Sequence, residues 1–344
     1  MPVTIRDVAN QAGTSVAAVS AVVSGSPNQN IRVGRKTRER ILTAAAELGY
    51  RPNPLAKGLV TGKSGMIGLV FPYSRAFTDG NPFAALIMSG VFEEVIREQY
   101  NVMLHTAIGE DWSSADEKDL LDPRVDGLLL VIPGPHSPSI ARCRQAGFPY
   151  VALVYAPDDL EVFAVNADEV AGGRLATEHL LQIGHRKIAH LMGDPKIATS
   201  EPRKCGYLEA MEAAGAPINP RWMVPAGFGD MGGYYAMKTL LDLPPSRRPT
   251  AVFAANDLCA EAALRAIHEA GARVPEDMAI VGYDDTRFAA MTRPPLTSVH
   301  MPIYEMGMLA TQMLIAQVEG REIEKRQVTL PVTLSVRDST RHSA

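Results

Sequence analysis

Hydrophobic positions in the first fifty residues recur at helical spacing and are separated by short polar turns. A capping pattern at Thr4 predicts a first helix that runs to Gln11. Ser15 predicts the cap of a second helix that ends near Val23, and a third helix is expected over about 35–48. Two short helices joined by a glycine turn and closed by a third are typical of a helix-turn-helix domain.

The second predicted helix has an inward face of valines and an outward face of small side chains. The outward residues are Val16, Ala17, Ser20 and Ala21. A recognition helix presents such a face to the DNA major groove, where small apolar groups can contact thymine methyls. This face has no Arg, Asn or Gln for a bidentate base contact. From these residues alone, a three-helix bundle that binds protein is the alternative.

Residues 51–63 predict a stiff segment that contains one short helix. Pro52 and Pro54 restrict the backbone, and Asn53 can cap a helix that reaches Leu59. Because so short a helix is marginal alone in water, we expect it to order only against a twin helix and DNA.

Beyond residue 64, continuous apolar stretches alternate with helical segments in two successive rounds. The apolar stretches begin near residues 66, 101, 126 and 149, and again near residues 187, 223, 250 and 278. Apolar strands that alternate with helices predict parallel sheets covered on both faces. The two rounds therefore predict two similar α/β subdomains with a ligand cleft at the carboxyl ends of their strands.

Composition argues against a secreted or membrane-spanning protein. The chain has 344 residues and a mean hydropathy of -0.02. Its longest aliphatic stretch, residues 128–132, is far shorter than the roughly 18 residues that a membrane helix needs. The first residues contain no apolar signal core, and three widely spaced cysteines provide neither a disulfide scaffold nor a CxxC metal site. We expect a cytoplasmic protein with no membrane partner.

Charge is distributed unevenly along the chain. Residues 1–63 carry nine Lys or Arg against three acidic residues, a net charge of +6, although the whole chain carries -4. The remaining residues therefore carry -10. A basic head on an acidic body indicates that one end of the molecule binds a polyanion such as DNA.

Three sequence runs closely resemble the lactose/galactose repressor (LacI/GalR) family of bacterial transcription regulators. They are TIRDVANQAGTSVAAVSAVVSG, TRERILTAAAELGYRPNPLAKGL and IGLVFP. The resemblance implies a lambda-repressor-like helix-turn-helix head over 1–50, a hinge helix and linker over 51–63, and a periplasmic-binding-protein-like core over 64–344. It further divides the core into a first subdomain (64–164 and 300–327) and a second subdomain (165–299 and 328–344).

The resemblance assigns DNA contacts to the hinge helix. In that family a hinge leucine, here Leu59, wedges into the minor groove and kinks the duplex, while the positions of Ala56 and Lys57 lie along the groove. For the phosphate backbone we predict contacts from the hydroxyl or charged side chains of Thr4, Ser15, Thr37 and Arg38.

The resemblance also gives candidate effector residues, one position at a time. They are Phe83, Tyr155, Asp168, Arg203, Asn256 and Asp284. Aromatic walls with one cationic, one amide and two acidic groups suit a polyhydroxylated ligand. Glu169 departs from the family, which usually has asparagine there. Ordinary structural roles remain open: Asp284 could close a turn, and Arg203 could pair with Glu201 or Glu209 on the surface.

Together these features predict a repressor that binds a pseudo-palindromic operator as a homodimer and responds to a small-molecule effector, most simply a sugar or sugar derivative. Pentoses, hexoses, sugar acids and nucleobases all fit the sequence, and it does not say whether the effector releases the protein from DNA or tightens its binding. The chain ends soon after LSVRDST, without the tail that makes some family members tetramers, which favours a dimer. The rivals are a solute-binding protein and a sugar- or nucleotide-modifying enzyme. A GxGxxG pattern at 227–232 and three histidines over 179–190 are weak signals, so no enzyme activity, cofactor or metal is expected.

Overall fold

A computed structural model describes residues 3–23, 32–51, 63–71, 82–105, 120–133, 138–155, 157 and 159–341. The chain divides into two compact units, Met1–Met66 and Ile67–Ala344. Each unit contains its own cluster of buried hydrophobic side chains. Most of the predicted hinge, including Ala56, Lys57 and Leu59, lies outside the described residues.

The first unit contains the predicted helix-turn-helix. Its helices are α1 (Ile5–Gln11), α2 (Val16–Val23) and α3 (Arg35–Glu47). Gly13 lies in the turn with φ +58°, and the Ser15 hydroxyl caps α2 by accepting a hydrogen bond from the Ala18 amide at 3.1 Å. Val8, Val19 and Ile41, one from each helix, are fully buried against one another.

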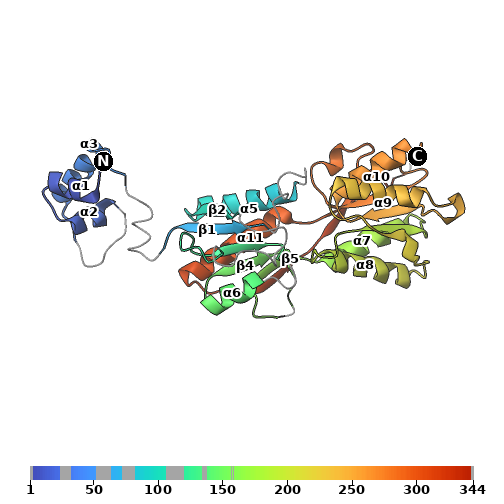
Figure 1. Cartoon of the computed structure of the whole chain (residues 1–344), viewed down its shortest axis with the longest axis horizontal. Coiled ribbons are helices and arrows are strands. Elements are labelled where there is room, and N and C mark those ends of the chain that lie inside the picture. The colour runs from blue at the N-terminus through green and yellow to red at the C-terminus, as the bar shows by residue number, and fades with distance from the viewer. Residues whose placement is uncertain are drawn as a thin grey trace. The chain divides into compact units, whose positions relative to one another are not determined.

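The second unit begins with a first lobe built on a sheet of order β11-β5-β4-β3-β1-β2 among the described residues. Its strands are β1 (Met66–Val70), β2 (Asn101–His105), β3 (Leu128–Val131), β4 (Tyr150–Leu153), β5 (Ala164–Ala167) and β11 (Gln327–Leu330). Its helices are α5 (Phe83–Arg97), α6 (Pro138–Ala146) and α11 (Ile303–Glu319), of which α5 and α11 pack together (Figure 1).

The second lobe repeats this architecture with a sheet of order β12-β10-β9-β8-β6-β7. Its strands are β6 (Ile188–Met192), β7 (Met223–Pro225), β8 (Ala251–Ala254), β9 (Ala279–Asp284), β10 (Thr297–His300) and β12 (Thr333–Ser335). Its helices are α7 (Glu169–Gln182), α8 (Ser200–Ala213), α9 (Asp230–Leu241) and α10 (Asp257–Glu269), with 3-10 turns η2 (Pro220–Trp222), η3 (Pro245–Arg247) and η4 (Ala289–Met291). The pair α7 and α8 covers one face of the sheet, and the pair α9 and α10 covers the other (Figure 1).

The strand pairs whose register the structure describes are parallel, as predicted, except that edge strand β12 pairs antiparallel with β10. The apolar pattern did not single out four of these strands, namely β5, β10, β11 and β12. They complete the two sheets, and each lies next to a point where the chain passes from one lobe to the other.

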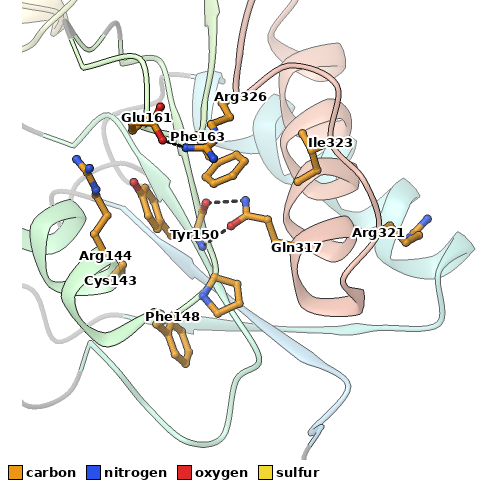
Figure 2. A pocket seen from close by; sticks show the side chains of 12 residues that line it. Cys143, Arg144, Phe148, Tyr150, Glu161, Phe163, Gln317, Arg321, Ile323 and Arg326 are labelled. Atoms are coloured by element: carbon orange, nitrogen blue, oxygen red, sulfur yellow. Dashed lines mark hydrogen bonds and ion pairs between the residues drawn. The ribbon is translucent and has the colours of Figure 1, made fainter.

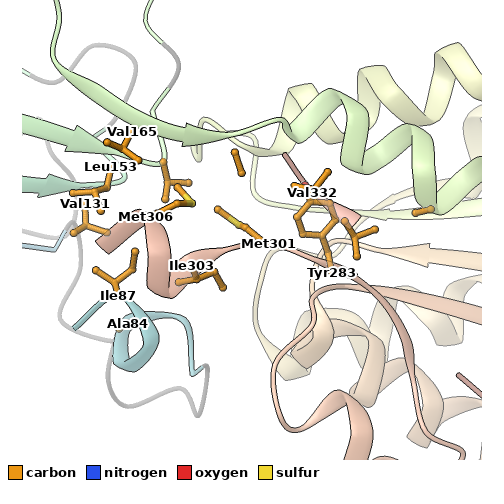
Figure 3. Packing of buried hydrophobic residues seen from close by; sticks show 14 of the residues in the cluster. Ala84, Ile87, Val131, Leu153, Val165, Tyr283, Met301, Ile303, Met306 and Val332 are labelled. Carbon is orange, nitrogen blue, oxygen red and sulfur yellow. The ribbon is translucent and has the colours of Figure 1, made fainter. Parts of the chain in front are cut away.

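Within the described residues, the chain crosses between the lobes three times. Because β5 and β11 both belong to the first sheet, two crossings follow Ala167 and Leu330, a few residues beyond the expected boundaries at 164 and 327. The third follows His300, where β10 leaves the second sheet for α11. Figure 3 shows Met301 at this crossing, between apolar side chains of the first lobe and Tyr283 of the second.

No helix in the described part of the chain is both long and apolar enough to cross a membrane.

Candidate functional site

The carboxyl ends of both sheets face the crossings, and a small cavity of about 40 Å³ lies there. The first lobe contributes Phe83, Ile132 and Val154, and the second contributes Ile197, Thr199, Arg203, Phe228, Asn256 and Asp284. A neighbouring cavity of about 220 Å³ shares Val154 and Thr199 with it and is also lined by Asp168 and Glu169. The cavities occupy the position that parallel α/β sheets use for ligands.

Three residues that line the smaller cavity have backbone conformations that their side chains disfavour. Ile132 has φ +48°, Val154 φ +55° and Asp284 φ +96°. A positive φ is a real outlier for a β-branched residue and costs roughly 1–3 kcal/mol. Ile132 and Val154 directly follow β3 and β4, and their amides continue the strand pairing by donating to the carbonyls of Leu153 and Val165. Such backbone strain clusters at functional sites, so it supports a functional site at the carboxyl ends of the sheets.

Arg203 lies in the wall of this cavity and is 4 % exposed. Its Nε donates to Glu169 Oε2 at 2.7 Å and its Nη2 to Glu169 Oε1 at 3.3 Å, while Nη1 donates to the carbonyl of Ala255. The guanidinium carbon lies 3.6 Å from the centre of the Tyr283 ring. The expectation that Arg203 could pair with Glu201 or Glu209 is therefore wrong, since Lys204 pairs with Glu201 and Arg174 lies near Glu209.

A close helix contact brings this pair together. Glu169 begins α7, and Arg203 lies one turn into α8. A Cβ added at Gly173 would lie 2.1 Å from the carbonyl oxygen of Arg203, and one at Gly206 would lie 2.0 Å from that of Val170. Glycine at both positions is therefore what allows α7 and α8 to approach this closely.

Asp168 and Asn256 have local roles in addition to any ligand contact. The Asp168 carboxylate accepts the Ala171 amide at 2.9 Å and caps α7. The Asn256 oxygen accepts the Cys259 amide at 2.9 Å and caps α10, and its amide nitrogen donates to the Phe228 carbonyl. Both caps follow a strand end, so helix capping alone would explain these residue types.

Burial shapes the electrostatics of the acidic groups. Burial raises the pKa of Asp284 well above its ordinary value; Arg203 opposes this, and Asp257 and Glu169 add to it. Burial likewise raises the pKa of Asp257 to about 6, although hydrogen bonds from Ser298 and the Thr286 amide lower it. For Arg203, burial lowers the pKa, but Glu169, Tyr283 and Asp284 outweigh it and hold the pKa above its usual range.

The structure brings together most, but not all, of the predicted effector residues. Phe83, Arg203, Asn256 and Asp284 line the smaller cavity and Asp168 the larger one, whereas Tyr155 lines neither. The sequence analysis missed Phe228 and the hydrophobic residues that follow β3 and β4. Phe228 lies within the GxGxxG pattern, where Gly232 is required because a Cβ there would lie 1.7 Å from the Ala226 carbonyl oxygen.

A third cavity, of about 580 Å³, lies at the opposite end of the strands of the first sheet, between α6 and α11 (Figure 2). Its arginines are already paired: Arg326 with Glu161, Arg144 with Asp159, and Arg321 with Glu98. The amino ends of the parallel strands lie here, whereas ligands usually bind at the carboxyl ends. The cleft, and not this larger cavity, therefore occupies the position that parallel α/β sheets use for ligands.

The head presents its predicted contact residues on the surface. On α2, Val16 and Ala17 are exposed and Ser20 and Ala21 half-buried, whereas Val19 and Val22 point inward. Arg38 is exposed on the first turn of α3, and Thr37 beside it is half-buried. Thr4 is exposed as well, and both its amide and its hydroxyl donate to the Asp7 carboxylate, at 2.8 and 2.7 Å.

Within the described residues, no group of three or more His, Cys, Asp or Glu side chains could hold a metal ion.

Comparison with known proteins identifies both units. Residues 4–53 match the model of bacterial regulatory proteins of the lacI family, and residues 177–340 match a periplasmic binding protein-like domain. The chain is 32% identical over 337 residues to the ribose operon repressor of Haemophilus influenzae, covering 98% of both chains. It is 35% identical over 339 residues to the transcriptional regulator CelR of Thermobifida fusca, again covering 98% of both. The chain belongs to the LacI family of bacterial regulatory proteins.

Solved structures of LacI-family proteins share this fold. A lac repressor dimer bound to operator and the anti-inducer ONPF is 29% identical, with a TM-score of 0.87 over 99% of both chains. The complex of CelR with cellobiose is 34% identical, with a TM-score of 0.74 over 98% of this chain and 99% of that one. This LacI-family protein thus combines the helix-turn-helix and two-lobed core that its sequence predicts.

Proposed function

We propose that this LacI-family protein is a cytoplasmic transcriptional repressor that binds a pseudo-palindromic operator as a homodimer. A small-molecule effector in the cleft between the core lobes controls its binding, and the protein turns over no substrate. The observation that carries the proposal is the presence in one chain of an exposed, small-residue recognition helix and a cleft at the carboxyl ends of two parallel sheets. The relatives named above are an operon repressor and a transcriptional regulator.

In this proposal α2 enters the major groove with Val16, Ala17, Ser20 and Ala21 toward the base edges. These side chains provide methyl contacts and at most weak hydrogen bonding, so they discriminate poorly between bases. We infer that specificity depends on insertion of Leu59 into the minor groove beside Ala56 and Lys57, and on the ease with which the operator bends.

Phosphate contacts would fix the head in register on the duplex. Ser15 can donate its hydroxyl to a phosphate because its oxygen, not its hydrogen, is used in capping α2. Thr37 and Arg38 lie at the amino end of α3, where backbone amides also favour an anion. Thr4 would have to release Asp7 before it could donate to a phosphate, which makes it the weakest of the four proposed contacts.

Exposed apolar side chains support a dimer formed through both lobes of the core. In the first lobe Phe92 and Ile96 of α5 are 42% and 76% exposed, and Leu104 of β2 is 40% exposed. In the second lobe Met231 and Tyr235 of α9 are 52% and 59% exposed. Clusters of exposed large apolar residues mark interaction sites, and a two-fold partner would supply the second head that a palindrome requires.

We propose the cleft as the effector site, with Phe83, Asp168, Arg203, Asn256 and Asp284 as contacts and Tyr155 at its margin. Each cavity is smaller than the roughly 300 Å³ typical of a small-molecule pocket, so binding requires the lobes to move. That movement is the proposed link to the DNA head. A typical coupling of about 1–3 kcal/mol would change operator affinity roughly 5–150-fold.

The experiment selects bound genomic fragments with the full-length protein and then measures affinity for the recovered site by fluorescence anisotropy at fixed salt. We expect an inverted-repeat site that binds at least about 10³-fold more tightly than random duplex. The Leu59→Ala variant should lose most of its specific affinity and little of its non-specific affinity. Equal affinity for the recovered site and random duplex would overturn the repressor function, and equal losses in Leu59→Ala would overturn the minor-groove role.

A further inference from the structure

The charge of Arg203 is neutralised before any ligand arrives. Glu169 contacts it through two oxygens, and both side chains are at most 5 % exposed. With the bonds to the Ala255 carbonyl and, from Nη2, to the Met301 sulfur at 3.9 Å, four of the five guanidinium N–H groups are engaged within the protein. One face of the guanidinium is covered by the Tyr283 ring at 3.6 Å. A ligand therefore meets an ion pair here, not an isolated cation.

The other charged groups at the cavity are acidic. Asp284 lines it, is 5 % exposed, and lies 3.9 Å from Arg203 Nη2. Asp257 lies behind it, held by the Ser298 hydroxyl at 2.5 Å and the Thr286 amide at 2.7 Å. One arginine thus faces Glu169 and Asp284, and Asp257 adds a third acidic side chain next to Asp284. Whichever of the two aspartates is protonated, the cluster carries no net positive charge.

We propose that Glu169 sets the charge selectivity of the cleft, so that the effector is an uncharged polyhydroxyl compound, and sugar acids and sugar phosphates are rejected. This inference rests on the proposed effector site and deepens it.

The selectivity follows from the hydrogen bonds that each ligand group can donate or accept in the cleft. A ligand hydroxyl can donate to the Asp284 carboxyl group and accept from Arg203 or the Asn256 amide, so a neutral sugar can satisfy both kinds of partner. A ligand carboxylate or phosphate can only accept. It would have to displace Glu169 from Arg203, which leaves two anionic groups at one buried cation, where repulsion between like charges is large.

The first test uses wild-type protein and matched ligand pairs. Thermal shift and isothermal titration would compare neutral sugars with their charged counterparts: glucose with glucuronate and glucose 6-phosphate, galactose with galacturonate, and ribose with ribose 5-phosphate, together with cellobiose and xylose. We expect every ligand that stabilises the protein to be neutral. A charged sugar that binds as tightly as its neutral partner would overturn the inference.

The second test changes Glu169. In Glu169→Asn and Glu169→Gln, Arg203 loses its buried counter-ion, so the ratio of acid to neutral-sugar affinity should rise at least about tenfold, or about 1.4 kcal/mol. The control Glu178→Gln removes a half-exposed carboxylate from the same helix and should leave this ratio unchanged. An unchanged ratio in a folded Glu169 variant would overturn the selectivity role. Should both variants fail to fold, the wild-type comparison still decides the effector class.

These outcomes separate this inference from the proposed function. Suppose that an anionic sugar binds tightly and also changes operator affinity. That outcome would refute the charge selectivity but would agree with the proposed function of an effector-controlled repressor. If no sugar of either series binds while operator binding is specific, the neutral-sugar class is refuted and DNA recognition is not.

Discussion

Arg203 combines two properties that are costly to combine, complete burial and a permanent positive charge. A buried charge is tolerated only when it is paired and hydrogen-bonded, and here Glu169, Asp284 and the Ala255 carbonyl meet that need. The same contacts fix the orientation of the guanidinium at the cavity. Stability and ligand recognition therefore depend on one side chain.

Replacing Arg203 with alanine should reduce stability as well as ligand response. The change leaves two acidic side chains buried without a cation, so we expect the free energy of unfolding to fall by about 3–5 kcal/mol. The control Arg174→Ala removes a half-exposed arginine from α7 and should cost no more than about 1 kcal/mol. Urea denaturation at pH 7 measures both, and similar losses would contradict a buried ion pair at Arg203.

Asp257 predicts a pH dependence of stability. Its pKa of about 6 in the folded protein lies above the usual value of 3.8, so the folded protein binds its proton more tightly than the unfolded chain does. This stabilisation is complete below pH 4 and is lost as the pH rises through 6.

The Asp257→Asn variant cannot lose this proton. The free energy of unfolding of the variant minus that of the wild type should therefore rise between pH 4 and pH 7, by at most about 3 kcal/mol. Denaturation curves across that range measure the difference, and a constant gap between the two proteins would show that Asp257 titrates normally.

At the scale of elements, the α7–α8 contact positions the site. Gly206→Ala would place a Cβ 2.0 Å from the Val170 carbonyl oxygen, and helix backbones cannot yield at so short a distance without separating. We expect a loss of about 1–3 kcal/mol in stability and a weaker ligand response, because Glu169 and Arg203 lie on the two helices.

Gly229→Ala provides the matched control in the same lobe. Gly229 has φ -100°, and an added Cβ there would meet nothing within 4 Å, so only the N-cap preference for glycine over alanine is lost, about 1 kcal/mol or less, and the ligand response should not change. Thermal unfolding and ligand titration of both variants would test this. Equal melting temperatures and equal ligand affinities in the two variants would mean that the α7–α8 contact tolerates a methyl group.

At the scale of the whole molecule, the division into two units predicts separable activities. The core unit from Ile67 onward contains both sheets and all of the described residues that line the cleft. A fragment of residues 64–344 should therefore fold and show the same ligand-induced rise in melting temperature as the full chain, yet bind no operator. Calorimetry and anisotropy measure the two properties. A fragment that failed to bind ligand would show that the cleft depends on the head.

Much of the architecture can be predicted from local sequence. The caps at Thr4 and Ser15 fix the starts of α1 and α2 because they act within one helical turn. The central strands follow from continuous apolar runs such as that of β3, which is buried throughout. The edge strands β11 and β12 lack such runs and are only half-buried or exposed, so their place in the sheets depends on partners far away in the sequence.

The helix-turn-helix, the two-lobed α/β core and the types of side chain at the strand ends can thus be inferred from local sequence, because capping, periodicity and strand polarity are local. The contacts of those side chains depend on the folded chain. The pairing of Arg203 with Glu169 joins residues 34 positions apart, and it exists because two glycines let their helices touch. Likewise, the positive φ angles of Ile132 and Val154 arise where separate strands end at one cleft, which no local pattern encodes.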